Sequence, residues 1–298
     1  MKQARLVPDR SDIIWKDYSS DGLTKTVIKA FREEIWNYYH QEGREFPFRS
    51  PRHYRVPYRV VISEIMLQQT QATRVQGKYL EFLKRFPDFK SIERATHAEI
   101  LEAWKGLGYN RRALALKKIA RMILHDHGGQ VPSEIDELEE FPWIGPNTAA
   151  SISTFAFNLP NVFIETNIRT VYLHFFFKDE KEVMDAEILP LVKQTLDTSN
   201  PREWYYALMD YGVFLKKRYK NKIAKRGKQY KRAAPFTGSS RQARGKILRL
   251  VLQEPRSLDE ITKHLGDEKP DNVASIINDM IKEGFLSRDG KMYSIKDS

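Results

Sequence analysis

Two acidic residues stand in sequence contexts that suit chemistry on a sugar. Glu64 lies within the mainly apolar run from Val60 to Leu67, and Glu165 stands two residues before Asn167. Burial among apolar neighbours raises the pKa of a carboxyl group, so that an acid such as Glu64 can donate a proton to a leaving group. A second carboxylate can stabilise the positive charge that a sugar acquires when its glycosidic bond stretches. Together the two residues predict the hydrolysis of a glycosidic bond.

Two further segments suit a base that is attached to a polynucleotide. Gln68, Gln69 and Thr70 follow Glu64. Polar side chains of this kind can fill the gap that a displaced base leaves in a stack. The segment from Phe141 to Ala149 indicates a tight turn before a helix, and backbone amide groups at such a turn can hold a phosphate. We therefore expect the removal of a base from DNA.

The composition agrees with a polyanionic partner. The chain has 298 residues, a formal net charge of +11 and a 41% share of hydrophobic residues, which is enough for a core. Ribosome-associated proteins and anionic membrane surfaces are the alternative explanations of such a charge. No apolar run reaches the roughly 18 to 20 residues that span a bilayer, and Met1 to Trp15 lack the apolar stretch of a secretory signal. We therefore expect no membrane partner and a cytoplasmic location, associated with the nucleoid in a prokaryote.

The elements that position these residues are predicted to be mainly helices. Apolar residues recur at helical spacing from residue 24 to about residue 215, and strand signals are sparse there. Glu64 falls inside one predicted helix, and two others begin at Asn147 and Asn167. We predict an all-α catalytic domain over residues 24–215.

A strongly basic segment follows, over residues 216–243. Ten of the residues from Lys216 to Arg232 are Lys or Arg, and none is acidic. One explanation is a solvated linker. The other, favoured by Tyr219 and Tyr230 among the cations, is an arm that follows DNA phosphates. The predicted phosphate contacts of this arm are Lys216, Lys217, Arg218 and Lys220.

Residues 244–298 are predicted to form a separate module. Apolar spacing indicates three helices, and Ser257 with Glu260 forms a capping box at the start of the second. Asp289 and Gly290 mark a two-residue hairpin turn after the third helix. Three helices and a hairpin are typical of a winged helix, a module that binds either DNA or proteins.

The segments Pro57–Gln71 and Trp104–Ala113, together with Phe46–Arg49, resemble the MutY-type adenine DNA glycosylases. Those enzymes belong to the helix–hairpin–helix superfamily that includes endonuclease III. The resemblance extends from about residue 28 to residue 215. It implies a mainly α, two-lobed helix–hairpin–helix glycosylase body that acts on double-stranded DNA. We also expect a monomer.

The resemblance implies roles for residues of the two quoted segments. Glu64 matches the acid that protonates the adenine and handles water. Gln69, with Gln68 and Thr70 beside it, matches the wedge loop that enters the duplex next to the displaced base. Tyr109 matches an aromatic residue near the target pair.

Two other residues match the remaining catalytic positions. Glu165 stands where the family has a catalytic aspartate, and Asn167 matches its neighbouring asparagine. The glutamate is longer by one methylene group, about 1.5 Å. A site shaped for another base, a slower enzyme and lost activity are three explanations of this difference. Asn147 occupies the position of the lysine that forms a Schiff base in bifunctional relatives, so no lyase step is expected.

The segment Phe141–Ala149 resembles the family's hairpin, which holds the DNA backbone and a monovalent cation. Trp143 replaces the first glycine of that hairpin, and a bulky residue there can change the path of the backbone. The backbone contacts that the resemblance implies outside the basic segment are Gly106, Gly108, Arg111, Ile144, Gly145 and Thr148.

Most adenine glycosylases of this type also carry four cysteines around an iron–sulfur cluster, and many have a β-rich domain that inspects 8-oxoguanine. This chain contains no cysteine, which excludes disulfides, a cysteine nucleophile and a thiolate-ligated cluster. We therefore expect no cofactor, and expect the basic segment to take over part of the cluster's role in DNA docking. The expected substrate is adenine opposite 8-oxoguanine or guanine. The alternatives are thymine or uracil opposite guanine, or a non-catalytic DNA-binding protein built on a glycosylase body.

Overall fold

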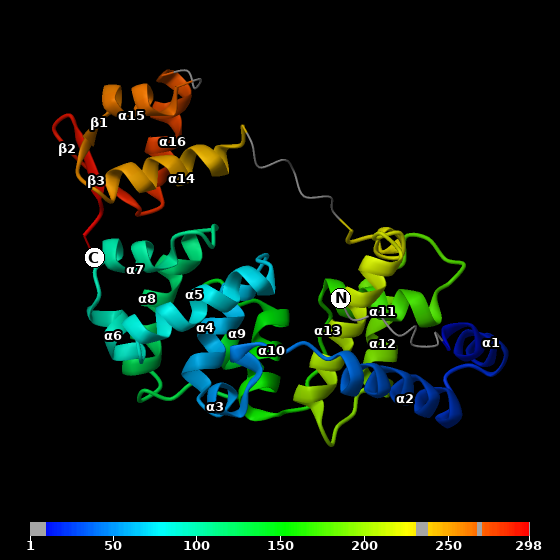
Figure 1. Cartoon of the computed structure of the whole chain (residues 1–298). Coiled ribbons are helices and arrows are strands. Elements are labelled where there is room, and N and C mark those ends of the chain that lie inside the picture. Colours follow the sequence, from blue (N-terminus) through cyan, green and yellow to red (C-terminus); the bar gives the residue numbers. More distant parts are fainter. Residues whose placement is uncertain (1–9, 231–237, 267–269, 298) are drawn as a thin grey trace. The chain divides into compact units, whose positions relative to one another are not determined.

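A computed structural model describes residues 10–230, 238–266 and 270–297. Within these residues it contains sixteen α-helices and one small antiparallel sheet, so the prediction of a mainly α protein is confirmed (Figure 1). They form two compact units. The first holds the described residues up to Val60, Pro132–Glu140 and the stretch from Ile144 to Tyr230. The second holds Val61–Val131, Phe141–Trp143 and the described residues from Gly238 onward.

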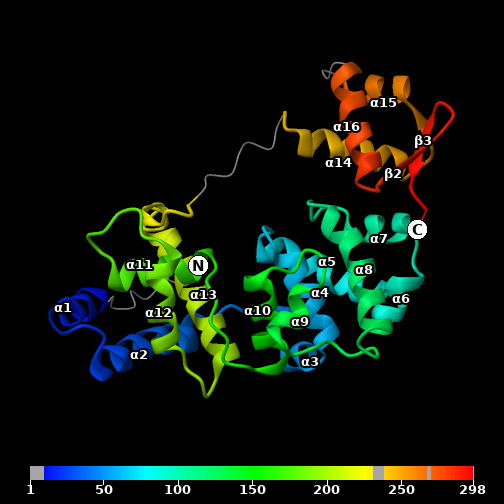
Figure 2. The same cartoon turned by 180° about the vertical axis from the view of Figure 1, so that it is seen from behind.

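The first unit is built around an aromatic core. Phe31 of α2 (Lys25–Glu42) is fully buried, and its ring centroid lies 5.1 to 5.9 Å from those of Tyr172, Phe175 and Trp204. These three residues come from α11 (Thr166–Phe176) and α13 (Pro201–Arg218), which lie side by side in both views (Figures 1 and 2). The other elements of this unit are α1 (Ser11–Asp21), η1 (Pro47–Arg49), α3 (Pro51–Tyr54), α9 (Ile135–Glu139), α10 (Pro146–Phe157), α12 (Asp185–Thr195) and η2 (Ala224–Arg226).

A buried ion pair fixes the loop before α3. The side chain of Asp210 in α13 is fully buried, and it accepts hydrogen bonds from Arg44 Nε (2.8 Å) and Arg49 Nη1 (3.0 Å). A buried carboxylate is stable only when cations and hydrogen bonds compensate for its lost water. The loop that contains Phe46–Arg49 is therefore held against α13.

The second unit starts within α4 (Pro57–Leu67) and continues through α5 (Ala72–Arg85), α6 (Phe89–Arg94), α7 (His97–Trp104) and α8 (Arg111–His125). Capping boxes start two of these helices, with Asp88 before α6 and Thr96 before α7. Helix α8 packs against both α6 and α7, and most of its residues from Arg112 to Ile123 are buried. Because of this central position, side chains of α8 can form hydrogen bonds to the neighbouring loops.

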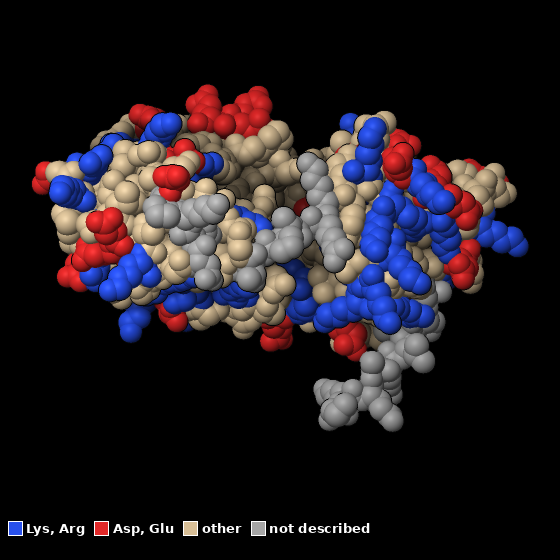
Figure 3. Space-filling model, turned by 90° about the horizontal axis from the view of Figure 1, so that it is seen from above, with Lys and Arg blue, Asp and Glu red and all other residues tan. Residues whose placement is uncertain are grey.

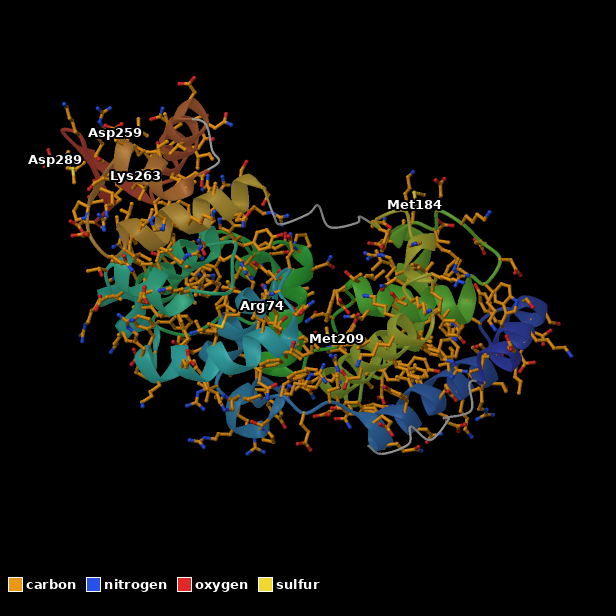
Figure 4. The ribbon with its side chains drawn as sticks, turned by 45° about the horizontal axis from the view of Figure 1, so that its top comes forward. Arg74, Met184, Met209, Asp259, Lys263 and Asp289 are labelled. Atoms are coloured by element: carbon orange, nitrogen blue, oxygen red, sulfur yellow. The ribbon has the colours of Figure 1, made fainter. Side chains whose placement is uncertain are left out.

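The C-terminal residues of the second unit have the predicted order of elements, with one additional strand. Helices α14 (Ser240–Val251), α15 (Leu258–Leu265) and α16 (Pro270–Lys282) precede the hairpin of β2 (Leu286–Asp289) and β3 (Met292–Ile295). The added strand β1 (Arg256–Ser257) pairs with β3, which gives the order β1-β3-β2. The predicted capping box of Ser257 and Glu260 is confirmed. Asp259 and Lys263 on α15 and Asp289 at the hairpin are exposed (Figure 4). The surface of these C-terminal elements therefore carries both acidic and basic side chains.

Residues 216–230 of the basic segment are folded onto the first unit, whereas residues 238–243 belong to the second unit. The first three residues of the segment end α13, and η2 follows after a turn. Arg226 donates hydrogen bonds to the carbonyls of Leu173, Phe177 and Lys178, and Gly227 forms a bridge with Val183. The basic side chains that remain exposed in residues 216–230 are Lys217, Arg218, Lys220, Lys222, Lys225 and Lys228. Figure 3 shows a dense group of Lys and Arg side chains on this face.

The predicted domain limits at 24–215, 216–243 and 244–298 stay a prediction, and Lys231 and Arg232 lie outside the described residues. No helix in the described part of the chain is long and apolar enough to cross a membrane.

Candidate active site

Glu64 lies on α4, most of which is buried. Val61, Ile62, Ser63 and Ile65 around it are buried, whereas Glu64 itself is partly exposed. The apolar run therefore forms core on the other faces of the helix and leaves one carboxylate within reach of solvent. The burial that the sequence predicts for Glu64 is therefore only partial.

The predicted wedge residues form the turn that ends α4, and a buried arginine holds this turn. Arg112 of α8 is 2% exposed. Its Nη1 donates hydrogen bonds to the carbonyls of Ile65 (2.7 Å), Met66 (3.0 Å) and Gln68 (2.6 Å), and its Nη2 donates to Thr70 Oγ1 (3.0 Å). The last carbonyls of a helix lack partners within the helix, and a cation complements the negative end of its dipole. Arg112 thus fixes the shape of the wedge turn.

The same guanidinium group also holds the glycine turn between α7 and α8. The carbonyl of Gly108 accepts hydrogen bonds from Arg112 Nη2 (3.0 Å) and Trp104 Nε1 (3.1 Å). Gly106 (φ 96°) and Gly108 (φ 72°) adopt left-handed conformations that glycine takes at little cost. Burial lowers the pKa of Arg112 to about 10, so the group is still charged at neutral pH. One cation therefore connects the two predicted lesion-facing turns.

Three non-glycine residues in these loops also have left-handed backbones. They are Gln69 (φ 52°), Tyr109 (φ 48°) and Trp143 (φ 68°). Such conformations are strained, by about 1–3 kcal/mol each, and are concentrated at functional sites. Gln68 Nε2 donates a hydrogen bond to the carbonyl of Trp143 (2.9 Å), which ties the wedge turn to the hairpin. Tyr109 is 43% exposed and Trp143 52% exposed, so both rings are available to a ligand.

The C-terminal helices contact two of the predicted DNA-facing residues. Arg241 Nη1 donates a hydrogen bond to Tyr109 Oη (3.0 Å). Arg111 forms an ion pair with Glu283, which also pairs with Arg244. Hydrogen bonds from Arg111 lower the pKa of Glu283. The predicted phosphate contact of Arg111 therefore competes with an internal carboxylate.

The hairpin connects α9 to α10. Gly145 is the extended residue before α10, and Pro146 occupies the first helical position. Trp143 adopts the left-handed conformation, which a glycine would take without strain. Of the residues predicted to contact the DNA backbone here, Gly145 is exposed, Thr148 is partly exposed and the side chain of Ile144 is buried.

Asn147 links the hairpin to the segment before the second carboxylate. It is exposed in the first turn of α10, and its Oδ1 accepts a hydrogen bond from the backbone amide of Ile164 (3.4 Å). Glu165 follows directly after Ile164. The amide of Asn147 thus helps to position the residue before Glu165.

Glu165 is the N-cap residue of α11. Its Oε1 accepts hydrogen bonds from the backbone amides of Asn167 (2.8 Å) and Ile168 (3.1 Å), and its Oε2 accepts one from Asn167 Nδ2 (3.2 Å). The side chain therefore folds back onto its own helix, and the extra methylene group is not used to reach outward. The two oxygens are held at the positive end of a helix, where negative charge is stabilised.

The residues predicted to contact the lesion and the backbone thus fall into two groups. Glu64, the wedge residues, the glycine turn with Tyr109, and Arg111 belong to the second unit. Asn147, Glu165 and Asn167, with the backbone contacts of the hairpin and the basic segment, belong to the first. Lys216 donates to Asn167 Oδ1 (2.7 Å), while Lys217, Arg218 and Lys220 are exposed.

The residues present do not fit the iron–sulfur cluster that the resemblance implies, because the 298 residues include no thiolate ligand. Among the residues that the structure describes, no group of three or more His, Asp or Glu side chains could hold a metal ion.

Arg112 is the main functional residue that sequence reasoning missed. A signal was available, since Arg112 precedes the buried Leu116, Ile119 and Ile123 at helical spacing. A cation on the apolar face of a helix indicates a buried hydrogen-bonding role.

Comparisons with known proteins show which proteins this chain resembles. Residues 62–194 match the HhH-GPD superfamily of base excision DNA repair proteins. The chain is 33% identical over 191 residues to an adenine DNA glycosylase of Buchnera aphidicola subsp. Baizongia pistaciae, which covers 62% of this chain and 53% of that relative. It is 29% identical over 198 residues to a thymine/uracil-DNA glycosylase of Methanothermobacter thermautotrophicus, which covers 65% of this chain and 88% of that relative. The chain thus spans about half the length of this adenine glycosylase.

A solved structure has the same fold. The structure of a thermostable thymine-DNA glycosylase superposes with a TM-score of 0.55 at 24% identity, and the match covers 69% of this chain and 88% of that chain. Residues 62–194 therefore form an HhH-GPD domain, and the resemblance to the helix–hairpin–helix glycosylases is confirmed.

Proposed function

We propose that this protein is a monofunctional DNA glycosylase of base excision repair, which hydrolyses the N-glycosidic bond of a mispaired base. The observation that carries the proposal is the carboxylate of Glu165, which three hydrogen bonds hold at the start of α11 beside Asn167. A fixed carboxylate can stabilise a cationic sugar without reorganising during the reaction. The match of residues 62–194 to base excision repair proteins supports this assignment.

In the proposed reaction Glu64 donates a proton to the departing base while the bond between the base nitrogen and C1′ breaks. The bonding electrons leave with the base, and Glu165 stabilises the positive charge on the sugar. A water molecule then attacks C1′ and gives its proton to the carboxylate of Glu64. The products are the free base and an abasic site.

The wedge turn would separate the base from its neighbours. Gln69, with Gln68 and Thr70, would enter the space of the displaced base, and Tyr109 would stack near the target pair. The left-handed backbones of Gln69 and Tyr109, which are both exposed, support this role, since such conformations are concentrated at functional sites. The hydrogen bonds of Arg112 would keep the turn rigid during insertion.

Adenine opposite 8-oxoguanine or guanine is the proposed substrate. The match to an adenine DNA glycosylase at 33% identity supports adenine. The match to a thymine/uracil-DNA glycosylase, at 29% identity over most of that relative, favours thymine or uracil opposite guanine as the second candidate. The proposed partner is double-stranded DNA bound by a monomer, and the proposed location is the cytoplasm, with association to the nucleoid in a prokaryote.

No lyase step accompanies the proposed hydrolysis. Asn147 has no amine that could attack C1′, and its side chain bonds to the backbone of Ile164. Borohydride should therefore trap no covalent complex with an abasic duplex. A trapped complex would contradict the monofunctional assignment. We further propose that no iron–sulfur cluster takes part and that the hairpin binds a monovalent cation.

A substrate panel tests the proposal. Duplexes with A opposite 8-oxoguanine, A·G, T·G, U·G and hypoxanthine are incubated with the protein and then heated in alkali, which cleaves abasic sites. We expect cleavage of the adenine duplexes. Cleavage of T·G or U·G alone would select the second candidate. Tight binding without cleavage of any duplex would leave the third candidate, a non-catalytic DNA-binding protein, which the departures at Glu165 and Trp143 favour.

A further inference from the structure

Helix α13 approaches the segment of Glu165 and Asn167 unusually closely. Gly212 of α13 has no side chain, and a Cβ atom placed on it would lie 2.3 Å from the backbone oxygen of Asn167. Real Cβ atoms essentially never come this close to another atom. Only glycine therefore lets α13 pack at this distance against the start of α11.

The close approach brings Lys216 to the side chain of Asn167. Lys216 stands four residues after Gly212, so both face the same side of α13. Its Nζ donates a hydrogen bond of 2.7 Å to Asn167 Oδ1. The lysine is partly buried, and this burial lowers the pKa of its amine, as does the charge of Arg169; the charge of Glu165 acts in the opposite direction. Lys216 thus differs from the exposed Lys217 and Arg218 that follow it.

This contact determines which way the amide of Asn167 faces. A protonated lysine can only donate, so it requires the carbonyl oxygen of the amide. The amide nitrogen then faces Glu165 and donates to its Oε2 (3.2 Å). The result is a chain of hydrogen bonds from Lys216 through Asn167 to Glu165.

We propose that Lys216 is a positioning residue of the active site, which fixes Asn167 so that Asn167 holds the carboxylate of Glu165. This inference rests on the proposed glycosylase function. It gives Lys216 a role distinct from the phosphate contact expected of it, while Lys217, Arg218 and Lys220 remain candidates for that contact. Groups that hold a metal ligand in place through a hydrogen bond change activity by about 10- to 100-fold when removed, and we expect an effect of similar size here.

The test measures binding and excision separately for Lys216→Met and for a control at an exposed lysine outside the basic segment, Lys193→Met. Single-turnover excision at saturating protein reports the chemical step, and the dependence of Kd on salt reports phosphate contacts. We expect Lys216→Met to lower the excision rate by about 10- to 100-fold with Kd and its salt slope unchanged. Lys193→Met should leave the rate at saturation, Kd and the salt slope unchanged. A weaker Kd and a smaller salt slope for Lys216→Met, with an unchanged rate, would overturn the inference in favour of a phosphate contact.

The pH dependence of excision supplies a second readout. A neutral amine can accept as well as donate, so it no longer fixes the amide. The excision rate of the unaltered protein should therefore fall as pH rises through the lowered pKa of Lys216. Lys216→Arg keeps its charge and should lose this alkaline fall. An unchanged alkaline fall in Lys216→Arg would contradict the inference.

The outcomes separate the inference from the proposed function. If the unaltered protein excises a base but Lys216→Met does so at the same rate, only the inference fails. If the unaltered protein excises no base, both fail together. Thermal unfolding identifies a variant that is inactive because it is unfolded, and Lys216→Arg then provides the test.

Discussion

At the scale of single residues, Glu165 combines a structural and a proposed chemical role. Its carboxylate caps α11 and is held by Asn167, so the same hydrogen bonds that stabilise the helix fix the group that would face the sugar. The longer side chain of a glutamate can accept these hydrogen bonds only by folding back, whereas an aspartate reaches the same backbone amides directly. The longer residue is therefore compatible with an active enzyme.

Glu165→Asp should retain both roles. Aspartate is a preferred N-cap residue, so the free energy of unfolding should change by no more than about 0.5 kcal/mol. Excision should persist. Glu165→Ala is the control, which should lose about 1 kcal/mol of stability together with excision. Chemical denaturation and the excision assay measure the two quantities, and an aspartate variant as inactive as the alanine variant would contradict this explanation.

Trp143 is strained and exposed, which predicts opposite effects on stability and binding. Trp143→Gly should raise the free energy of unfolding by about 1 kcal/mol, because glycine adopts a left-handed backbone freely. The same change should weaken DNA binding, since base stacking on an aromatic side chain contributes about 1–3 kcal/mol. Urea unfolding and equilibrium DNA binding test the two effects. A glycine variant that binds DNA as tightly as the unaltered protein would show that the indole makes no contact with DNA.

At the scale of elements, Arg112 joins α4, α8 and the glycine turn. Arg112→Met removes this donor from the carbonyls of Ile65, Met66 and Gln68, so we expect a loss of about 2–5 kcal/mol in the free energy of unfolding. The adjacent Arg111→Met is the control. Half of the Arg111 side chain is exposed, and its ion pair with Glu283 should contribute at most about 1 kcal/mol. Equal losses in the two variants would refute the anchoring role of Arg112.

The packing of α13 on α11 gives a second prediction at this scale. Gly212→Ala places a methyl group against the backbone of Asn167, so stability should fall by about 1–3 kcal/mol and excision should decrease. Gly77→Ala in α5 is the matched control. A Cβ there meets nothing within 4 Å, and the change should stabilise the helix by about 0.5–1 kcal/mol. If Gly212→Ala is as stable and as active as Gly77→Ala, the close approach of α13 to α11 contributes neither to stability nor to excision.

At the scale of the whole molecule, we expect the exposed lysines of the basic segment to bind DNA phosphates and so to contribute to DNA affinity. Changing Lys217, Lys220 and Lys222 to Gln should reduce the slope of log affinity against log salt by about 0.9 for each phosphate contact that is lost. The control changes the same number of exposed lysines elsewhere, at Lys25, Lys29 and Lys193. If affinity and slope are the same in both triple variants, the segment does not dock DNA.

Local features of this chain were predictable, and contacts between distant segments were not. The capping box at Ser257 and the helical character of residues 24–215 follow from short-range patterns. The run of cations that starts at Lys216 predicted the same phosphate contact for Lys216 as for its neighbours, but Lys216 is partly buried. Its burial depends on Asn167, which is 49 residues away in sequence, and on the missing side chain of Gly212. The anchoring by Arg112 likewise depends on α4, more than 40 residues earlier.

The central claim is that Glu165 supplies the carboxylate for base excision. Single-turnover excision of adenine opposite 8-oxoguanine by Glu165→Gln tests it most directly, because glutamine keeps the size of the side chain and removes its charge. We predict that excision is abolished while DNA affinity is unchanged. Excision at the rate of the unaltered protein would contradict the account.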